Sequence, residues 1–107
     1  MAVRMEKPWR RLDEENVAKL AGQLGVFELA DDSQQTIYVG CADARSLFGL
    51  KGELQSWLGK AAHFRIEVTT AYRTRYRELL MVHHADRGSY PELNSTKETA
   101  GLGRLSP

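Results

Sequence analysis

The residues best suited to chemistry lie in the segment Arg73-Thr74-Arg75-Tyr76-Arg77. A guanidinium matches the geometry of a phosphate, and a tyrosine ring can stack on a base. Between positions 60 and 77 the basic residues are Lys60, Arg65, Arg73, Arg75 and Arg77 and the one acidic residue is Glu67, so the local charge is +4. This pattern is typical of a surface that contacts nucleic acid. On a helix, however, Arg75 lies about 200° from Arg73, so a solvated face with ion pairs explains the pattern as well.

Two other groups of residues invite a metal or thiol interpretation. His83 and His84 are adjacent, and on a helix their side chains diverge by about 100°, which makes them a poor chelating pair. Cys41 is the only cysteine in the sequence, which excludes an intrachain disulfide and a cysteine-rich zinc site and favours a reducing compartment. We therefore predict neither zinc binding nor thiol chemistry.

The composition is that of a soluble globular protein with one domain. Hydrophobic residues make up 42% of the 107 residues, and 15 basic against 14 acidic residues give a net charge of +1, which neither favours nor excludes a nucleic-acid partner. No apolar run approaches the roughly 18 residues of a membrane span, and the N-terminus lacks the apolar region of a signal peptide. We expect a cytoplasmic protein that does not contact membranes.

A small set of helices and strands must position these residues. Asp13, followed by two glutamates, predicts the N-cap of a helix at about 13–22. The runs 25–30 and 36–40, on either side of the polar turn 31–35, predict a β-hairpin. The further predicted elements are a helix from Arg45 or Ser46 to Leu58, a strand at 63–69 and a helix at about 71–86.

The predicted elements form an α+β fold with a small three-stranded sheet, the hairpin plus one strand, flanked by helices. A turn centred on Asp32 and Ser33 would pair Phe27 with Tyr38 on one face of that sheet. The opposite face would then hold Val26, Ile37 and Val39. The expected divisions of the chain are a basic N-terminal segment 1–12, one domain at 13–94 and a flexible C-terminal tail 95–107.

Over about residues 24–94 the sequence resembles the GIY-YIG nuclease superfamily. Gly25-Val26-Phe27 stands for the first motif of that family and Tyr38-Val39-Gly40 for the second, at a similar spacing. The segment Arg-Glu-Leu-Leu-Met-Val that contains Glu78 looks like the family's helix with a metal-binding glutamate. Pro91-Glu92-Leu93-Asn94 looks like the proline and asparagine that close the family domain. The resemblance therefore implies a GIY-YIG-like fold.

The resemblance also implies a chemistry. In that family a divalent metal assists the hydrolysis of a phosphodiester, which here implies Mg²⁺ or Mn²⁺ held by Glu78 and a water positioned by Tyr38. Phe48 stands where the family has its phosphate-binding arginine, and Lys51 or Arg45 could supply that cation instead. The implied partner is nucleic acid, DNA in preference to RNA. The candidate nucleic-acid-binding residues are Arg45, Arg73, Arg75 and Arg77.

Three functions remain open at this point. The first is a divergent endonuclease that uses Tyr38, Glu78 and Lys51 or Arg45. The second is a GIY-YIG-like domain that binds nucleic acid but has lost catalysis. The third is a protein-interaction module that uses the basic N-terminus or the tail. We favour the two nucleic-acid functions, with weak or absent catalysis, because Phe27 replaces the first-motif tyrosine and cannot hydrogen-bond a water.

Overall fold

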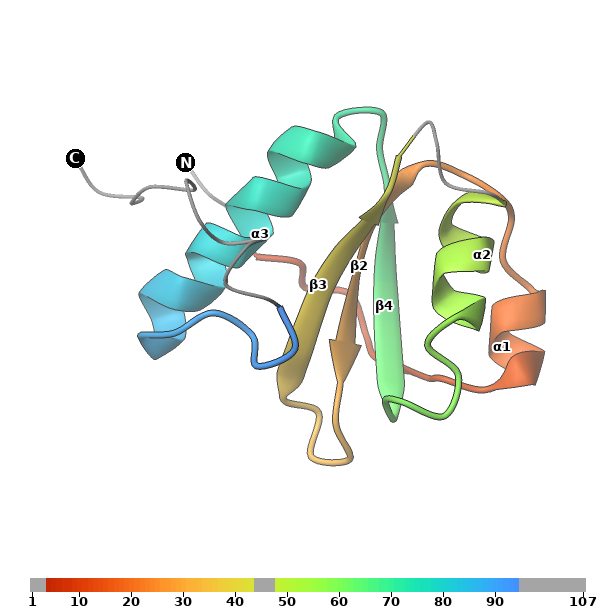
Figure 1. Cartoon of the computed structure of the whole chain (residues 1–107), viewed down its shortest axis with the longest axis horizontal. Helices are drawn as coiled ribbons and strands as arrows, with labels where there is room; N and C mark the ends of the chain where they lie inside the picture. Colours follow the sequence, from red (N-terminus) through yellow and green to blue (C-terminus); the bar gives the residue numbers. More distant parts are fainter. Residues whose placement is uncertain (1–3, 44–47, 95–107) are drawn as a thin grey trace.

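A computed structural model of the chain describes residues 4–43 and 48–94. Within these ranges, an antiparallel sheet is covered on one face by helix α3 (Tyr72–Arg87) and on the other by helices α1 (Glu14–Ala18) and α2 (Gly49–Gln55) (Figure 1). This arrangement confirms the predicted α+β class. Arg45, the expected start of a helix at 45 or 46 and the expected tail 95–107 lie outside the described residues.

In the described part of the chain, the sheet has four strands rather than the three that we expected. The strand order is β1 (Arg10–Arg11), β4 (His63–Val68), β2 (Gly25–Ala30) and β3 (Thr36–Ala42). β1 is the additional strand, and it pairs Arg10 with Phe64 and Arg11 with His63. Because two exposed arginines show no alternation of apolar and polar residues, the sequence pattern does not reveal this strand.

Part of the N-terminal segment 1–12 belongs to the folded domain. Met5 is only 2% exposed and lies in a core cluster with Leu79 and Leu80. Arg4 donates two hydrogen bonds to the carboxylate of Asp86, at 2.5 and 2.6 Å. Residues 4–12 therefore contribute a strand, a core side chain and an ion pair, although their basic composition sets them apart in the sequence.

The hairpin pairs its strands two residues away from the predicted register. Leu29 lies opposite Tyr38, and Phe27 lies opposite Gly40. Because the shift is an even number of residues, Phe27 and Tyr38 keep the same face, as predicted, and their ring centroids are 5.9 Å apart. A Cβ atom at Gly40 would lie 2.4 Å from Cζ of Phe27, so only glycine leaves room for that ring.

An irregularity in the hairpin moves one side chain to the other face. The pairing shifts between Leu29 and Ala30, and the extra residue on β3 is Ile37. Ile37 therefore lies in the core cluster that contains Phe27, not with Val39 on the opposite face as predicted. The physical reason is the extra residue itself, because it breaks the two-residue alternation of a strand.

α1 begins at the N-cap that the sequence predicts, but α1 ends at Ala18 and α2 at Gln55, before the expected ends at 22 and 58. Asp13 is the N-cap of α1, and its carboxylate accepts a hydrogen bond from the backbone N–H of Asn16 at 2.8 Å. Before α2, Phe48 has a φ of 63°, so a regular helix cannot continue through it from position 45. α3 ends at Gly88 with a φ of 77°, as the glycine predicts. Within the described residues, no helix has the length and apolar composition needed to cross a membrane.

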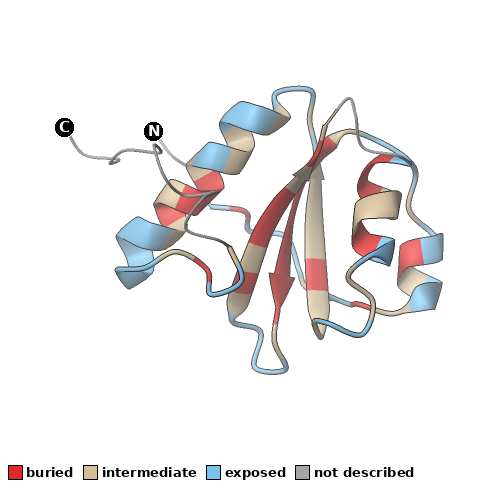
Figure 2. Cartoon of the chain, in the orientation of Figure 1, coloured by how far each residue is buried: buried red, intermediate tan, exposed pale blue. Residues whose placement is uncertain are grey.

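Two hydrophobic clusters, one on each face of the sheet, stabilise the domain (Figure 2). We call the side under α1 and α2 the α2 face and the side under α3 the α3 face. The α2 face is filled by Leu12, Val17, Phe27, Leu29, Ile37, Ala42, Leu50, Leu54 and Phe64. The α3 face is filled by Met5, Val26, Val39, Leu79 and Leu80. The alternation of side chains along each strand assigns neighbouring residues to different faces.

The open edge of β3 is covered by residues that follow α3. The amide of Asn94 donates to the carbonyl of Val39 and accepts from its N–H, both at 2.9 Å. The N–H of Leu93 donates to the carbonyl of Ile37 at 2.9 Å. Pro91 is fully buried beside this edge segment. These contacts satisfy backbone groups that would otherwise be free to pair with another chain.

Candidate functional site

Tyr38 lies on the α2 face, packed among aromatic side chains. Its ring centroid is 4.5 Å from that of Trp57 and 5.9 Å from that of Phe27. The side chain is partly buried and contacts the α2-face cluster. Its strand β3 and the turns after α2 therefore hold the ring in an aromatic group, where it contributes packing.

Glu78 lies on the α3 face, in an ion-pair cluster centred on Arg75. Arg75 Nη1 donates to a carboxylate oxygen of Glu78. The same guanidinium donates to both carboxylate oxygens of Glu67 on β4, at 2.8 and 3.1 Å. Burial lowers the pKa of Arg75, but the hydrogen bonds and charges of Glu67 and Glu78 outweigh it and leave that pKa raised. The arginine is therefore a fixed cation between two carboxylates.

The sheet separates the two residues that the resemblance assigns to one catalytic site. Tyr38 contacts the cluster under α2, whereas Glu78 is tied through Arg75 to Glu67 under α3. Phe64 and Glu67, three residues apart on β4, lie on opposite faces and mark the two sides. The structure therefore does not bring Tyr38 and Glu78 together.

The surroundings of Glu78 do not suit a divalent metal ion. The cation beside its carboxylate is already the guanidinium of Arg75. Among the described residues, no group of three or more histidine, cysteine, aspartate or glutamate side chains could hold a metal ion. A Mg²⁺ or Mn²⁺ ion prefers several oxygen ligands, so the residues present here do not fit such an ion.

The remaining predicted site residues are spread over different elements. Lys51 is a partly exposed residue of α2, on the same side of the sheet as Tyr38, and Arg45 lies outside the described residues. Arg73 and Arg77 are both exposed and share one side of α3, because they are four residues apart. Neither of these two arginines has an ion pair within the described residues. Arg75 points to the sheet and the other two point to solvent.

A charged cavity lies on the α3 face, between the N-terminal segment and the C-terminal half of α3. We call it the α3 cavity, and its volume is about 280 Å³. Its floor is an ion pair between neighbouring strands, in which Arg65 Nε donates to Glu28 Oε1 at 2.7 Å. The lining residues are Arg4, Met5, Glu6, Glu28, Thr36, Arg65, Leu79, Val82, His83, Asp86 and Arg87. This cavity combines a buried carboxylate, an imidazole and guanidinium groups.

Glu28 is the most strongly buried charged group of the α3 cavity. The residue is only 6% exposed. Burial raises the pKa of Glu28, and the nearby positive charge of Arg65 lowers it only in part. Arg65 is itself held by the carbonyl of Lys7 and by the ring of Trp9, whose centroid is 4.1 Å from the guanidinium carbon. These contacts fix the floor of the cavity.

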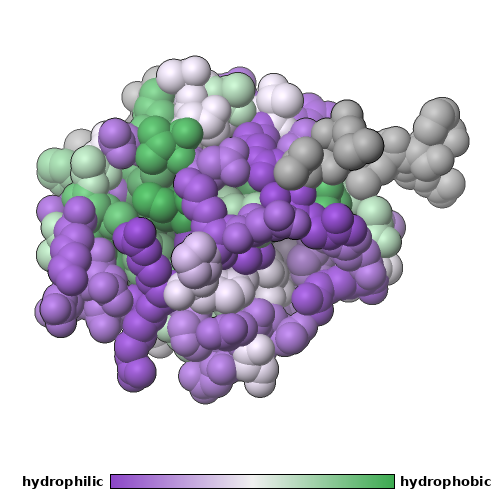
Figure 3. Space-filling model, turned by 180° about the vertical axis from the view of Figure 1, so that it is seen from behind, coloured by the Kyte–Doolittle hydropathy of each residue, from purple (hydrophilic) through white to green (hydrophobic). Residues whose placement is uncertain are grey.

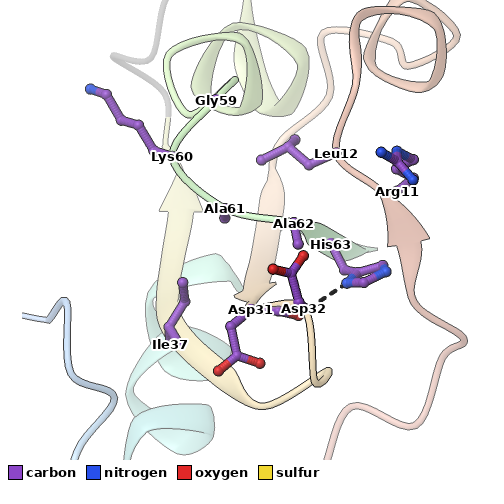
Figure 4. A pocket seen from close by; sticks show the side chains of 10 residues that line it. All are labelled: Arg11, Leu12, Asp31, Asp32, Ile37, Gly59, Lys60, Ala61, Ala62 and His63. Carbon is purple, nitrogen blue, oxygen red and sulfur yellow. Dashed lines mark hydrogen bonds between the residues drawn. The ribbon is translucent and has the colours of Figure 1, made fainter.

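A second cavity of about 460 Å³ lies at the end of the sheet where the hairpin turns (Figure 4). His63 Nδ1 donates to the carbonyl of Asp31 at 3.1 Å, and the carboxylate of Asp31 accepts from the N–H groups of Ser33 and Gln35. Figure 4 shows the side chain of Lys60 pointing away from the two aspartates. These polar groups stabilise the turn, so this cavity is not our leading candidate.

The pairing of Glu28 with Arg65 and the environment of His83 are not among the predictions from the sequence. A signal was present, because Glu28 is the only charged residue in the otherwise apolar strand Gly25–Ala30. A buried charge requires an opposite charge nearby. Arg65, in the middle of the next strand, is that partner, but only the pairing of β2 with β4 shows that the two residues are neighbours.

Comparison with known proteins identifies a family for most of the chain. A family described as "Domain of unknown function (DUF7508)" matches residues 3–87. No GIY-YIG family model matches the chain. No curated protein and no solved structure matches the chain.

Proposed function

We propose that this chain, which belongs to the family described as domain of unknown function DUF7508, binds nucleic acid without hydrolysing it. The observation that carries this proposal is that the arginines of α3 have different surroundings. Arg75 is held toward the sheet by two glutamates, whereas Arg73 and Arg77 are exposed on one side of the helix. Two exposed guanidinium groups without ion pairs in the described structure can form bidentate contacts with successive phosphates.

The proposal that the chain does not hydrolyse nucleic acid is supported by the positions of Tyr38 and Glu78 on opposite faces of the sheet. A hydrolytic site of the GIY-YIG type needs a tyrosine and a metal-bound glutamate around one phosphate. Here Tyr38 packs against Trp57 on the α2 face, and Glu78 is neutralised by Arg75 on the α3 face. Phe27 adds no polar group beside Tyr38. The GIY-YIG-like order of strands and helices still supports nucleic acid, and DNA in preference to RNA, as the partner class.

The proposal is tested by fluorescence anisotropy with labelled single-stranded DNA, duplex DNA and RNA of one sequence, at several salt concentrations. We expect the dissociation constant to rise steeply with salt, because phosphate contacts release counterions. Arg73→Gln and Arg77→Gln should each weaken binding and reduce the salt slope by about 1. Lys19→Gln removes the same charge from an exposed residue of the α1 side, so it is the matched control. Equal salt slopes for the arginine variants and this control would contradict the proposal.

A second candidate function, a protein-interaction module, is favoured by exposed apolar side chains. Phe48 is 67% exposed and Val68 is 50% exposed. The face seen in Figure 3 carries a continuous hydrophobic area beside charged side chains. This function predicts self-association that persists at high salt and weakens in Val68→Ser, which sedimentation velocity measures. A monomer at all concentrations would contradict self-association through this apolar area.

A further inference from the structure

The α3 cavity has features that phosphate binding does not use. The residues of α3 that line it come from its C-terminal half, from Leu79 to Arg87, whereas Arg73 and Arg77 lie in the N-terminal half. The cavity is closed on one side by the N-terminal segment, which Arg4 fastens to Asp86. A ligand in this cavity would therefore bind independently of nucleic acid.

His83 leaves an unused hydrogen-bond acceptor in the wall of the α3 cavity. Its Nδ1 is 2.8 Å from the carbonyl oxygen of Ser89. A carbonyl can only accept, so Nδ1 carries the proton and the neutral ring has an acceptor at Nε2. Nε2 is buried and has no hydrogen-bond partner among the described residues. A buried acceptor of this kind requires a donor from a ligand or a water.

Glu28 presents a second acceptor on the floor of the same cavity. One carboxylate oxygen accepts from Arg65 Nε. The raised pKa of Glu28 indicates that burial outweighs the compensation by Arg65. An additional positive group near this carboxylate would therefore stabilise its ionised form. Glu28 and His83 both line this cavity, so the two acceptors belong to one site.

The arginines that line the α3 cavity do not exclude a cation. Arg4 is paired with Asp86, Arg65 with Glu28, and Arg87 donates to the side-chain oxygen of Gln35. The acidic lining residues Glu6, Glu28 and Asp86 balance the three arginines in formal charge. A volume of about 280 Å³ is at the lower limit for a ligand pocket, so the ligand is small.

We propose that the α3 cavity binds a small organic cation with N–H donors, of the guanidinium or primary ammonium class. In this site Glu28 faces the positive charge, and Nε2 of His83 accepts a hydrogen bond from the ligand. The apolar side chains of Leu79 and Val82 accommodate a short alkyl group. A divalent metal fits less well, since the described residues contain no group of three metal ligands.

The test is isothermal titration calorimetry of the full chain with methylguanidinium, and with tetramethylammonium as a matched cation that has no N–H. We expect saturable binding of methylguanidinium that is about tenfold tighter than any binding of tetramethylammonium, the effect of a charge-assisted hydrogen bond. His83→Phe and Glu28→Gln should each weaken binding about tenfold. His84→Phe is the matched control, because His84 is exposed and does not line the cavity.

A second measurement does not depend on variants that fold correctly. In ¹⁵N spectra of the wild-type imidazoles, methylguanidinium should shift Nε2 of His83 and leave the ring nitrogens of His63 and His84 unchanged. The proposal is overturned if His83 does not shift, if both cations bind equally, or if His83→Phe folds and binds as the wild type does. Failure of nucleic-acid binding would leave this result unaffected, since the arginines of that surface lie outside the cavity.

Discussion

Substitution of Glu78 or Arg75 should reduce stability, because both belong to a mostly buried ion-pair cluster. The Arg75 side chain is 13% exposed, and those of Glu67 and Glu78 are 28% and 30% exposed. Glu78→Gln leaves Arg75 paired with Glu67, so we expect a loss of about 1 kcal/mol in the free energy of unfolding. Arg75→Met leaves two carboxylates without their cation, and we expect a loss of about 2–3 kcal/mol.

Urea denaturation, followed by tryptophan fluorescence, measures these changes. In thermal denaturation, a loss of 1 kcal/mol corresponds to about 4–8 °C for a domain of this size. Arg77→Met is the matched control, because Arg77 is exposed on the same helix and lacks an ion pair in the described structure, so its effect should stay within about 0.5 kcal/mol. The double variant Glu78→Gln/Arg75→Met should lose less than the sum of the two single losses, because the residues are in contact.

This reasoning would be refuted if Glu78→Gln kept the stability of the wild type and lost a catalytic activity. If Glu78→Gln unfolds at the same urea concentration as the wild type and abolishes a metal-dependent hydrolysis that the wild type performs, Glu78 is a metal ligand. The ion pair with Arg75 would then not describe its role.

Three further predictions concern the packing and charge of the sheet. Gly25→Ala should lower the free energy of unfolding by about 2–3 kcal/mol, because a Cβ atom would lie 2.2 Å from the backbone oxygen of Glu67. An unchanged midpoint of thermal denaturation would contradict this prediction. Asn94→Ala removes two hydrogen bonds to Val39, so amide exchange of Val39 should accelerate at least about tenfold, and equal exchange would contradict the edge contact. Because folding raises the pKa of Glu28 above 4.5, its contribution to stability is present below pH 4.5 and is lost as pH rises through the folded value. The stability of the wild type relative to Glu28→Gln should therefore fall with rising pH over that window, and a rise would contradict the burial of the charge.

The sequence predicts the hairpin and α3 because the residues that begin or end these elements act on their immediate neighbours in the chain. The polar turn after Ala30 and the glycine at position 88 act on neighbouring residues, and Asp13 caps the next turn of chain. The register was wrong by two residues, since it depends on the geometry of the turn and on the irregularity after Leu29. The strand β1 was missed because two arginines gain their strand conformation only by pairing with β4.

The candidate site was less predictable because it depends on which face each helix covers. Chain order alone does not show that α3 covers the face opposite to Tyr38. The pair of Glu28 and Arg65 is 37 residues apart in the sequence and forms only through the pairing of β2 with β4. Long-range pairing therefore decides both the separation of Tyr38 from Glu78 and the formation of the α3 cavity.

The most direct test of the proposed function measures binding and cleavage in the same samples. Labelled DNA is incubated with the wild type, Arg73→Gln/Arg77→Gln and Glu78→Gln in the presence of Mg²⁺ or Mn²⁺, and bound and cut fractions are separated on gels. We predict intact DNA in every sample, salt-sensitive binding by the wild type and Glu78→Gln, and weakened binding by the arginine variant. Cleavage by the wild type that is lost in Glu78→Gln would contradict the proposal.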